Sequence, residues 1–198
     1  MRPDLDIIQQ WIKAGSRVLD LGCGDGTLLH YLQQTRQVHG IGLEIDAQNI
    51  EACLGKGVSV IEQNLNQGLE NFQSDSFDTV LLAQTLQALD KPNELIAEML
   101  RIGRNVIVTF PNFGNWKSRL HLLGRGRMPV SEFIPYEWYN TPNIHFCTVK
   151  DFDVLCARQN IKVLTRTVVD SEHQGSWYMK LWPNLLGEIA IYHITRKQ

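Results

Sequence analysis

The sequence predicts an α/β fold with a mostly parallel sheet of seven strands and a site for a nucleoside-containing ligand, and three observations support this. An apolar strand beginning near Val18 runs into Gly22, Gly24 and Gly26, whose alternate spacing lets the backbone turn tightly and approach a ligand. A helix pattern follows, so unpaired N–H groups are expected beside the glycines. Glu44 ends the next apolar strand, where a carboxylate can accept hydrogen bonds from ribose hydroxyls.

The first part of the chain alternates helix and strand patterns. A short amphipathic helix is expected before Gly15, which ends it. Asp46 is the expected cap of a later helix. The resulting βαβαβ order requires parallel pairing with right-handed crossovers. Its elements are expected at about 16–21, 26–34, 38–44, 47–54 and 58–61.

The rest of the chain continues the alternation after a polar loop. Pro92 opens a helix to about residue 102, because the missing N–H of proline costs nothing in the first helical turn. Thr148 and Asp151 form a predicted capping box for a helix ending at about residue 159. The remaining strands are expected at 77–83 and at about 105–110, 162–169 and 187–195.

Regular alternation stops between Pro111 and Cys147. A segment this long and aromatic inside a compact domain is expected to cover a site or to serve a function. It carries an aromatic cluster of Trp116, Phe133, Tyr136, Trp138, Tyr139 and Phe146. Its basic residues, with no acid between 116 and 127, are Lys117, Arg119, Arg125 and Arg127. A solvated amphipathic helix, a docking face for an acidic protein surface and a patch for RNA phosphates are the alternatives, and the aromatic neighbours favour a protein over RNA.

Composition limits the remaining possibilities. With 198 residues, of which 43% are hydrophobic, we expect a single domain over residues 1–198. A formal net charge of −2 gives no overall electrostatic attraction for nucleic acid. The four cysteines are scattered without a C-x-x-C pair, so neither a metal site nor a disulfide framework is expected. No apolar run is long enough to cross a bilayer, and we expect a cytoplasmic protein without a membrane partner.

The glycine motif distinguishes two classes of nucleotide-binding protein. Dinucleotide-binding dehydrogenases favour G-x-G-x-x-G around a pyrophosphate, whereas this chain has D-x-G-x-G-x-G beginning at Asp20. A carboxylate there would repel pyrophosphate but suits a ligand that carries an ammonium and a sulfonium. Together with Glu44, Asn64 and the pair Phe77-Asp78, the motif resembles the class I S-adenosylmethionine-dependent methyltransferases over residues 16 to about 110.

This resemblance implies a Rossmann-like fold with an antiparallel last strand, a cover segment at about 111–147, and S-adenosylmethionine or S-adenosylhomocysteine as cofactor. Asp20 would fix the amino group or the loop, Glu44 would bind the ribose, and Gln84 would line the pocket floor. Family members often carry aspartate in place of Asn64, so this amide donates to a different ring nitrogen or binds more weakly. The implied cofactor-binding residues are Asp20, Gly22, Gly24, Glu44, Ile45, Asn64, Leu65 and Gln84.

A closer resemblance, to the methionine biosynthesis protein MetW family, extends over nearly the whole chain. It is carried by the strings Leu82–Gln87, Phe110–Trp116, Arg127–Val130, Pro135–His145 and Leu185–Glu188. It implies a partner, homoserine O-acyltransferase, whose acylation step in methionine synthesis this protein would support. The stoichiometry, the acyl group transferred and a homodimer of this chain stay open.

The alternative function is a methyltransferase acting on a small molecule. The Asn/Asp-Pro-Pro-aromatic string of amino-methylating enzymes is replaced here by Gln84-Thr85-Leu86, so no complete catalytic set is evident. The catalytic candidates are His145, Tyr136 and Gln84.

Overall fold

The structure is a computed structural model that describes residues 3–130, 136–170, 172 and 174–197. Its seven-stranded sheet has the order β3-β2-β1-β4-β5-β7-β6. β7 runs antiparallel to both β5 and β6, and the other neighbouring pairs are parallel, which confirms the predicted fold class. The strands are β1 (Arg17–Leu21), β2 (His39–Glu44), β3 (Ser59–Glu62), β4 (Phe77–Ala83), β5 (Gly103–Pro111), β6 (Ile161–Val169) and β7 (Ile189–Arg196).

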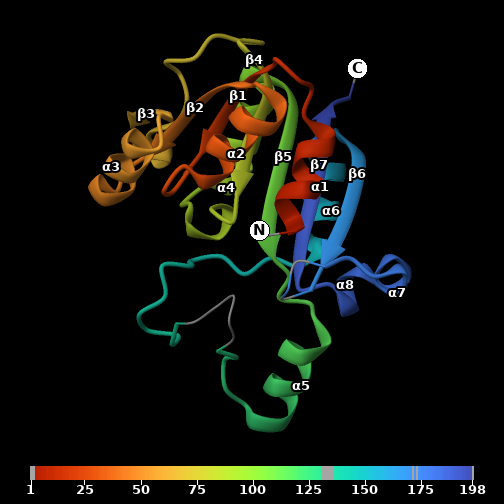
Figure 1. Ribbon diagram of the computed structural model, residues 1–198. Coiled ribbons are helices and arrows are strands. Elements are labelled where there is room, and N and C mark those ends of the chain that lie inside the picture. Colours follow the sequence, from red (N-terminus) through yellow and green to blue (C-terminus); the bar gives the residue numbers. More distant parts are fainter. Residues whose placement is uncertain (1–2, 131–135, 171, 173, 198) are drawn as a thin grey trace.

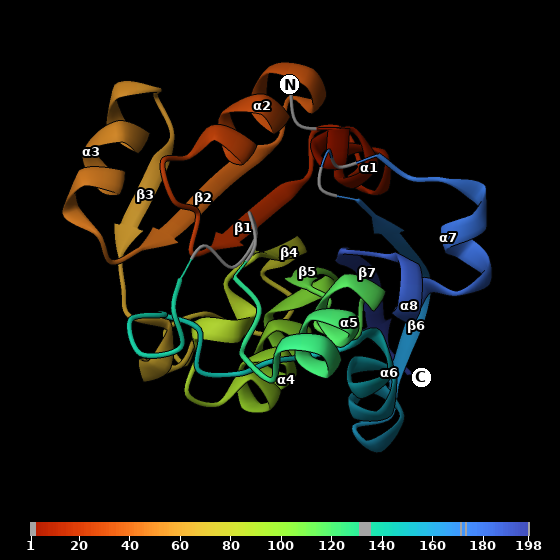
Figure 2. The same ribbon diagram turned by 90° about the horizontal axis from the view of Figure 1, so that it is seen from below.

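Helices cover both faces of the sheet (Figures 1 and 2). Buried side chains of α1, α2 and α3 pack on one face, and those of α4 and α6 pack on the other. α5 and the chain after it extend beyond the carboxyl end of β5 (Figure 1). None of the described helices is long and apolar enough to cross a membrane. The helices are α1 (Pro3–Trp11), α2 (Thr27–Arg36), α3 (Ala47–Gly55), α4 (Pro92–Ile102), α5 (Trp116–Arg125), α6 (Val149–Arg158), α7 (Trp177–Leu181) and α8 (Pro183–Leu186), with 3-10 turns η1 (Leu65–Gln67) and η2 (Leu86–Ala88).

Two predicted helix caps are confirmed. The Asp46 side chain accepts hydrogen bonds from the backbone N–H groups of Gln48 and Asn49, both at 3.0 Å, and begins α3. Thr148 and Asp151 form the reciprocal capping box that begins α6. Because these bonds join residues two or three positions apart, the local sequence is enough to specify them.

The region after β6 differs from the sequence prediction. Two short helices, α7 and α8, precede the last strand, which begins at Ile189 rather than near residue 187. Gly187 ends α8 and packs so tightly that an added Cβ would lie 2.4 Å from Cβ of Val168. Among the aromatic residues expected in the cover segment, Phe133 lies outside the described residues.

Tyr192 ties β7 to α6 in the core. Its fully buried hydroxyl donates to Oδ1 of Asp153 at 2.8 Å and lies 3.1 Å from the carbonyl oxygen of Val149. We expect Tyr192→Phe to lower the free energy of unfolding by about 1–2 kcal/mol, because the hydrogen bond from the buried hydroxyl to the half-buried carboxylate of Asp153 is lost. Urea denaturation measures the loss, and Tyr178→Phe, at an exposed position, serves as the control. Equal midpoints for the two variants would contradict this assignment.

Candidate functional site

The predicted glycine loop joins β1 to α2 at the carboxyl edge of the sheet. Gly22, Gly24 and Gly26 have φ values of 68°, 56° and 75°, in the left-handed region that favours glycine. A Cβ added at Gly22 would come 2.7 Å from Oγ1 of Thr85, so the loop packs closely there. A Cβ added at Gly24 would meet nothing within 4 Å. The middle of the loop therefore faces open space.

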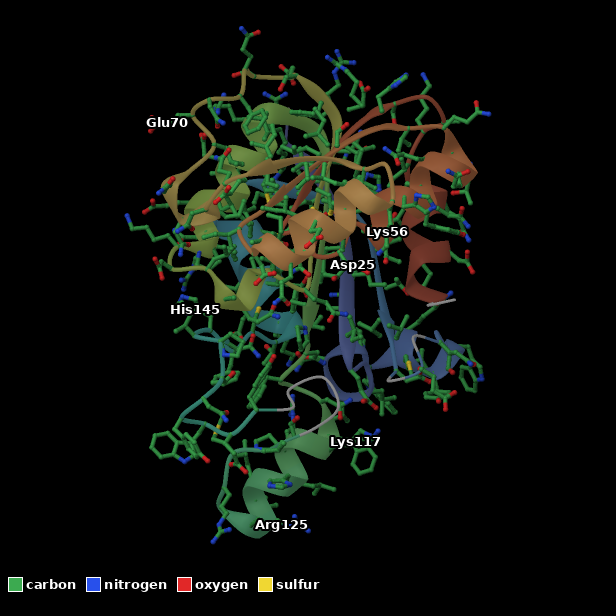
Figure 3. All side chains as sticks on the ribbon, turned by 60° about the vertical axis from the view of Figure 1, so that its left-hand side comes forward. Asp25, Lys56, Glu70, Lys117, Arg125 and His145 are labelled. Carbon is green, nitrogen blue, oxygen red and sulfur yellow. The ribbon has the colours of Figure 1, made fainter. Side chains whose placement is uncertain are left out.

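An ion pair fixes the far end of the glycine loop. Nζ of Lys56 contacts the Asp25 carboxylate at 2.5 Å and Oγ1 of Thr27 at 2.8 Å, which ties the start of α2 to the residue after α3 (Figure 3). The hydrogen bond from Lys56 lowers the pKa of Asp25 to about 2. The sequence reasoning missed this pair, because its two residues lie 31 positions apart in the chain.

Glu44 lies beside the open part of the loop, as the sequence predicts. Its side chain is held by three backbone N–H groups: Oε2 accepts from Gly24 at 2.8 Å, and Oε1 accepts from Ile45 at 2.8 Å and Asp46 at 3.0 Å. Only 8% of the residue surface is exposed. The carboxylate is therefore fixed at the end of β2 and directed at the glycine loop.

Asp20 is a second carboxyl group behind the same loop. It is 1% exposed, and its Oδ1 atom has no hydrogen-bond partner among the described residues. Burial, together with the nearby Glu44 carboxylate, raises the pKa of Asp20 from its usual 3.8 to about 7. Because buried polar atoms almost always have partners, an unpaired carboxyl oxygen here points to a missing donor or cation.

Two thiols fill the space beneath the loop. Sγ of Cys23 lies 3.8 Å from Sγ of Cys53, and both cysteines are free and buried. Burial raises the pKa of each thiol. Thiols that stay protonated are poor nucleophiles, so the two cysteines act as packing residues.

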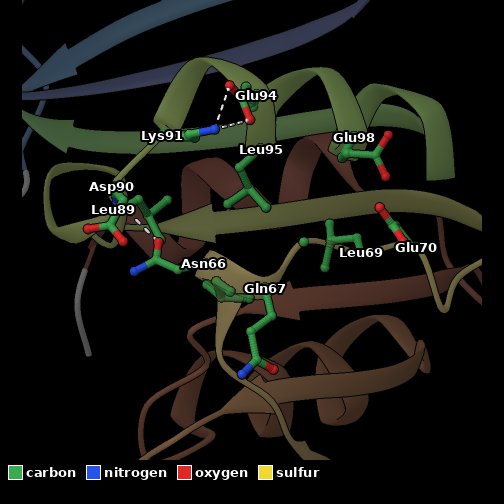
Figure 4. A pocket seen from close by; sticks show the side chains of 12 residues that line it. Asn66, Gln67, Leu69, Glu70, Leu89, Asp90, Lys91, Glu94, Leu95 and Glu98 are labelled. Atoms are coloured by element: carbon green, nitrogen blue, oxygen red, sulfur yellow. Dashed lines mark hydrogen bonds and ion pairs between the residues drawn. The ribbon is translucent and has the colours of Figure 1, made fainter.

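The residues expected around adenine are divided between two surface recesses. Ile45, which is 59% exposed, lines a recess of about 720 Å³ together with Asn64. Leu65 instead lines a neighbouring recess of about 330 Å³ (Figure 4). Oδ1 of Asn64 accepts from the N–H of Asn66 at 3.0 Å, which leaves the NH₂ of the amide as a donor.

Gln84 follows β4 in an unusual conformation. Its φ of 56° lies in a region that residues other than glycine rarely adopt, and such strain is concentrated at functional sites. The backbone N–H of Gln84 donates to the carbonyl oxygen and to Oγ1 of Thr109, both at 3.0 Å, which holds it there. Since Thr85 packs on Gly22, Gln84 is positioned next to the glycine loop.

His145 and Gln84 are linked through one residue, Gln87. The backbone N–H of His145 donates to the carbonyl oxygen of Gln87 at 3.0 Å. Nε2 of Gln87 in turn donates to the carbonyl oxygen of Gln84 at 2.6 Å. His145 also borders an apolar recess of about 160 Å³ lined by Leu86, Phe110, Phe113 and Phe146. Tyr136, the third catalytic candidate, is exposed, and no hydrogen bond between described residues joins it to the other two.

Solved structures define the class of this fold. A SAM-dependent methyltransferase from Archaeoglobus fulgidus is similar with a TM-score of 0.68 and 16% identity, covering 98% of this chain and 92% of that one. An S-adenosylmethionine-dependent methyltransferase from Mesorhizobium loti has a TM-score of 0.67 and 14% identity, and the match covers 98% of this chain and 96% of that one. The [4+2]-cyclase SpnF has a TM-score of 0.69 and 16% identity, and the match covers 98% of this chain and 81% of that one. The chain therefore has the class I methyltransferase fold.

Sequence comparison identifies the family. The protein-family model described as methionine biosynthesis protein MetW matches residues 2–194, and the chain belongs to this family. The bifunctional methionine biosynthesis protein MetXA/MetW of Rhodopirellula baltica is 40% identical over 204 residues, which cover 98% of this chain and 33% of that protein. The chain thus spans about a third of the length of this relative. A ubiquinone biosynthesis O-methyltransferase of Hahella chejuensis is 30% identical over 95 residues, covering 46% of this chain and 40% of that one.

Proposed function

We propose that the protein binds S-adenosylmethionine or S-adenosylhomocysteine at the glycine loop. The observation that carries this proposal is the buried Oδ1 of Asp20, which has no hydrogen-bond partner among the residues that the structure describes, behind a loop whose middle glycine faces open space. The ammonium group of the cofactor supplies the missing donor and a compensating charge. Gly22 and Gly24 pass beneath the methionine portion, where the lack of side chains leaves room for it.

Glu44 and Asn64 would bind the nucleoside part. An ionised carboxylate offers about four acceptor positions, of which three are filled in Glu44. Two ribose hydroxyls need two free positions, so Glu44 would have to release one of its three backbone hydrogen bonds. We expect this to be the bond from the N–H of Gly24, because Gly24 belongs to the glycine loop. The NH₂ of Asn64 suits a ring nitrogen of adenine, and Ile45 suits the ring face. Leu65 would contribute through its backbone, because the residue lines the neighbouring recess.

The protein would use this fold to support homoserine O-acyltransferase in methionine synthesis. The observation that supports this role is the relative named MetXA/MetW, in which a region 40% identical to this chain belongs to a longer polypeptide that carries both names. Two proteins joined in one relative commonly act together when they are separate. Since none of the catalytic candidates forms a recognised catalytic set, association and activation explain the site better than an independent reaction does.

Copurification followed by an acylation assay tests this role. We expect the chain to form a complex with homoserine O-acyltransferase and to raise its rate of homoserine acylation severalfold. The proposal would be contradicted if the acyltransferase did not bind the chain and acylated homoserine at the same rate with and without it.

A methyltransferase acting on a small molecule is the second candidate. The apolar recess beside His145 favours it, because this recess and the strained Gln84 both lie at the carboxyl edge of the sheet. Incubation with cofactor labelled at the methyl group and a cell extract should then give a labelled product. Labelling equal to that of a Glu44→Ala control would exclude this activity.

A further inference from the structure

α5 is a helix that buries none of its residues against the described part of the chain. The structure describes all ten of its residues, and none of them is buried. The helix is attached at its start, where the side chain of Asn115 accepts from the N–H of Lys117 at 2.9 Å and Nζ of Lys117 contacts Glu188 at 2.5 Å. Isolated helices of this length are marginal in water, so a surface that covered α5 would stabilise it.

Exposed apolar side chains continue from α5 into the chain that follows it. Leu123 is 84% exposed and Trp138 is 74% exposed. A recess of about 640 Å³ joins the two parts, because His121 and Arg125 line it from α5 while Met128 and Trp138 line it from the later segment. We name this region the α5 surface, and its exposed apolar residues are Trp116, Leu120, Leu122, Leu123, Met128, Trp138 and Tyr139. Trp, Tyr, Met and Arg are the residues enriched at protein interfaces.

The charge of the α5 surface limits what can cover it. Between residues 116 and 127 there are four basic residues and no acid. One acid, Glu137, lines the recess of the α5 surface. More acidic residues gather around the recess of Figure 4, and Glu70 lies far from Lys117 and Arg125 (Figure 3). The complementary surface therefore has an apolar centre and an acidic rim.

A second copy of this chain matches that description poorly. Two acids of the recess in Figure 4 already form local ion pairs, Glu94 with Lys91 at 3.2 Å and Glu98 with Arg101 at 2.8 Å. None of the large hydrophobic residues that are exposed in the described part of the chain lies in that recess. Two of its four acids are thus taken up in local ion pairs, and the recess lacks the exposed apolar centre that the α5 surface needs.

We propose that the α5 surface is the docking site for homoserine O-acyltransferase, on a face of that enzyme with an apolar centre and an acidic rim. This inference rests on the proposed function. In the relative that carries both names in one polypeptide, the two parts are held at high effective concentration, and a separate chain needs an interface instead. Leu120 and Leu123 enter the apolar centre, and Arg125 and Arg127 contact the rim.

Calorimetric titration of the purified acyltransferase with variants of the full chain tests the docking site. We expect Leu123→Glu, and separately the double variant Arg125→Glu/Arg127→Glu, to weaken the complex at least about tenfold. Val154→Glu on α6 and Glu94→Lys on α4 introduce similar changes at exposed positions of other surfaces and should alter affinity less than about twofold. Because every altered residue is exposed, all four variants should keep wild-type circular dichroism and cofactor binding.

Three outcomes would overturn this inference, and they are distinguishable. Equal affinities of the wild-type chain and the Leu123→Glu variant for the acyltransferase would reject the α5 surface as the docking site and leave the proposed function intact. Wild-type chain that does not bind would reject both. A chain that sediments alone as a dimer, and as a monomer once Leu123 is changed to Glu, would show that a second copy covers this surface.

Discussion

Replacement of Glu44 by alanine should weaken the binding of S-adenosylmethionine by about ten- to a hundredfold. The charge-assisted hydrogen bonds to the ribose hydroxyls, net of the bond to the N–H of Gly24 that they replace, are worth roughly 1.5–3 kcal/mol in total. Isothermal titration calorimetry measures the change. Glu44→Gln keeps an acceptor for the N–H groups of Ile45 and Asp46 and should still lose about tenfold, because the charge is gone.

Two controls separate binding from folding in this experiment. Glu51→Ala removes an exposed carboxylate from α3 and should leave the affinity unchanged. Thermal unfolding shows whether the Glu44 variants remain folded once Gly24 loses its acceptor. Folded Glu44→Ala protein with wild-type affinity would remove this residue from the site.

Asp20→Asn should stabilise the unliganded protein in a pH-dependent way. Because the pKa of Asp20 is about 7 in the folded state against its usual 3.8, the wild type loses stability as the pH rises from 4 to 7. This difference corresponds to about 4 kcal/mol, at roughly 1.4 kcal/mol for each pH unit. Asparagine cannot ionise, so the stability gained by the variant should grow over that range and stay constant above pH 7. Urea denaturation from pH 4 to pH 8 measures it, and a constant difference would contradict the buried, unpaired carboxyl group.

The same carboxyl group should make cofactor binding depend on pH. A cofactor ammonium favours ionised Asp20, so binding releases a proton wherever the free protein is protonated at this position. We expect S-adenosylmethionine to bind nearly tenfold more weakly at pH 6 than at pH 7.5, an order-of-magnitude estimate from proton linkage. Titrations in buffers of different ionisation enthalpy count the released protons. Equal affinities at the two pH values would place the ammonium away from Asp20.

Local patterns made much of the fold and part of the site predictable. The three glycines, the cap at Asp46 and the capping box at Thr148 depend on residues a few positions apart, and the structure contains each of them. The position of Glu44 beside the glycine loop was predictable, because the carboxyl ends of neighbouring parallel strands meet at one edge of the sheet.

Other features depend on contacts between distant segments. The pair of Asp25 and Lys56 joins residues 31 positions apart, and the left-handed backbone of Gln84 is held by Thr109 on the next strand. The missing partner of Asp20 became evident only from its surroundings. For α5 the sequence left three alternatives, because an amphipathic pattern with basic residues does not show whether anything packs against it.

A crystal structure of the protein with S-adenosylhomocysteine is the most direct test of the cofactor site. We predict one molecule at the glycine loop, with its ribose hydroxyls on the Glu44 carboxylate and its amino group beside Oδ1 of Asp20. A ligand bound elsewhere would contradict the account. So would a crystal soaked with saturating ligand in which Glu44 still accepts the hydrogen bond from Gly24 and no ligand atom lies beside Oδ1 of Asp20.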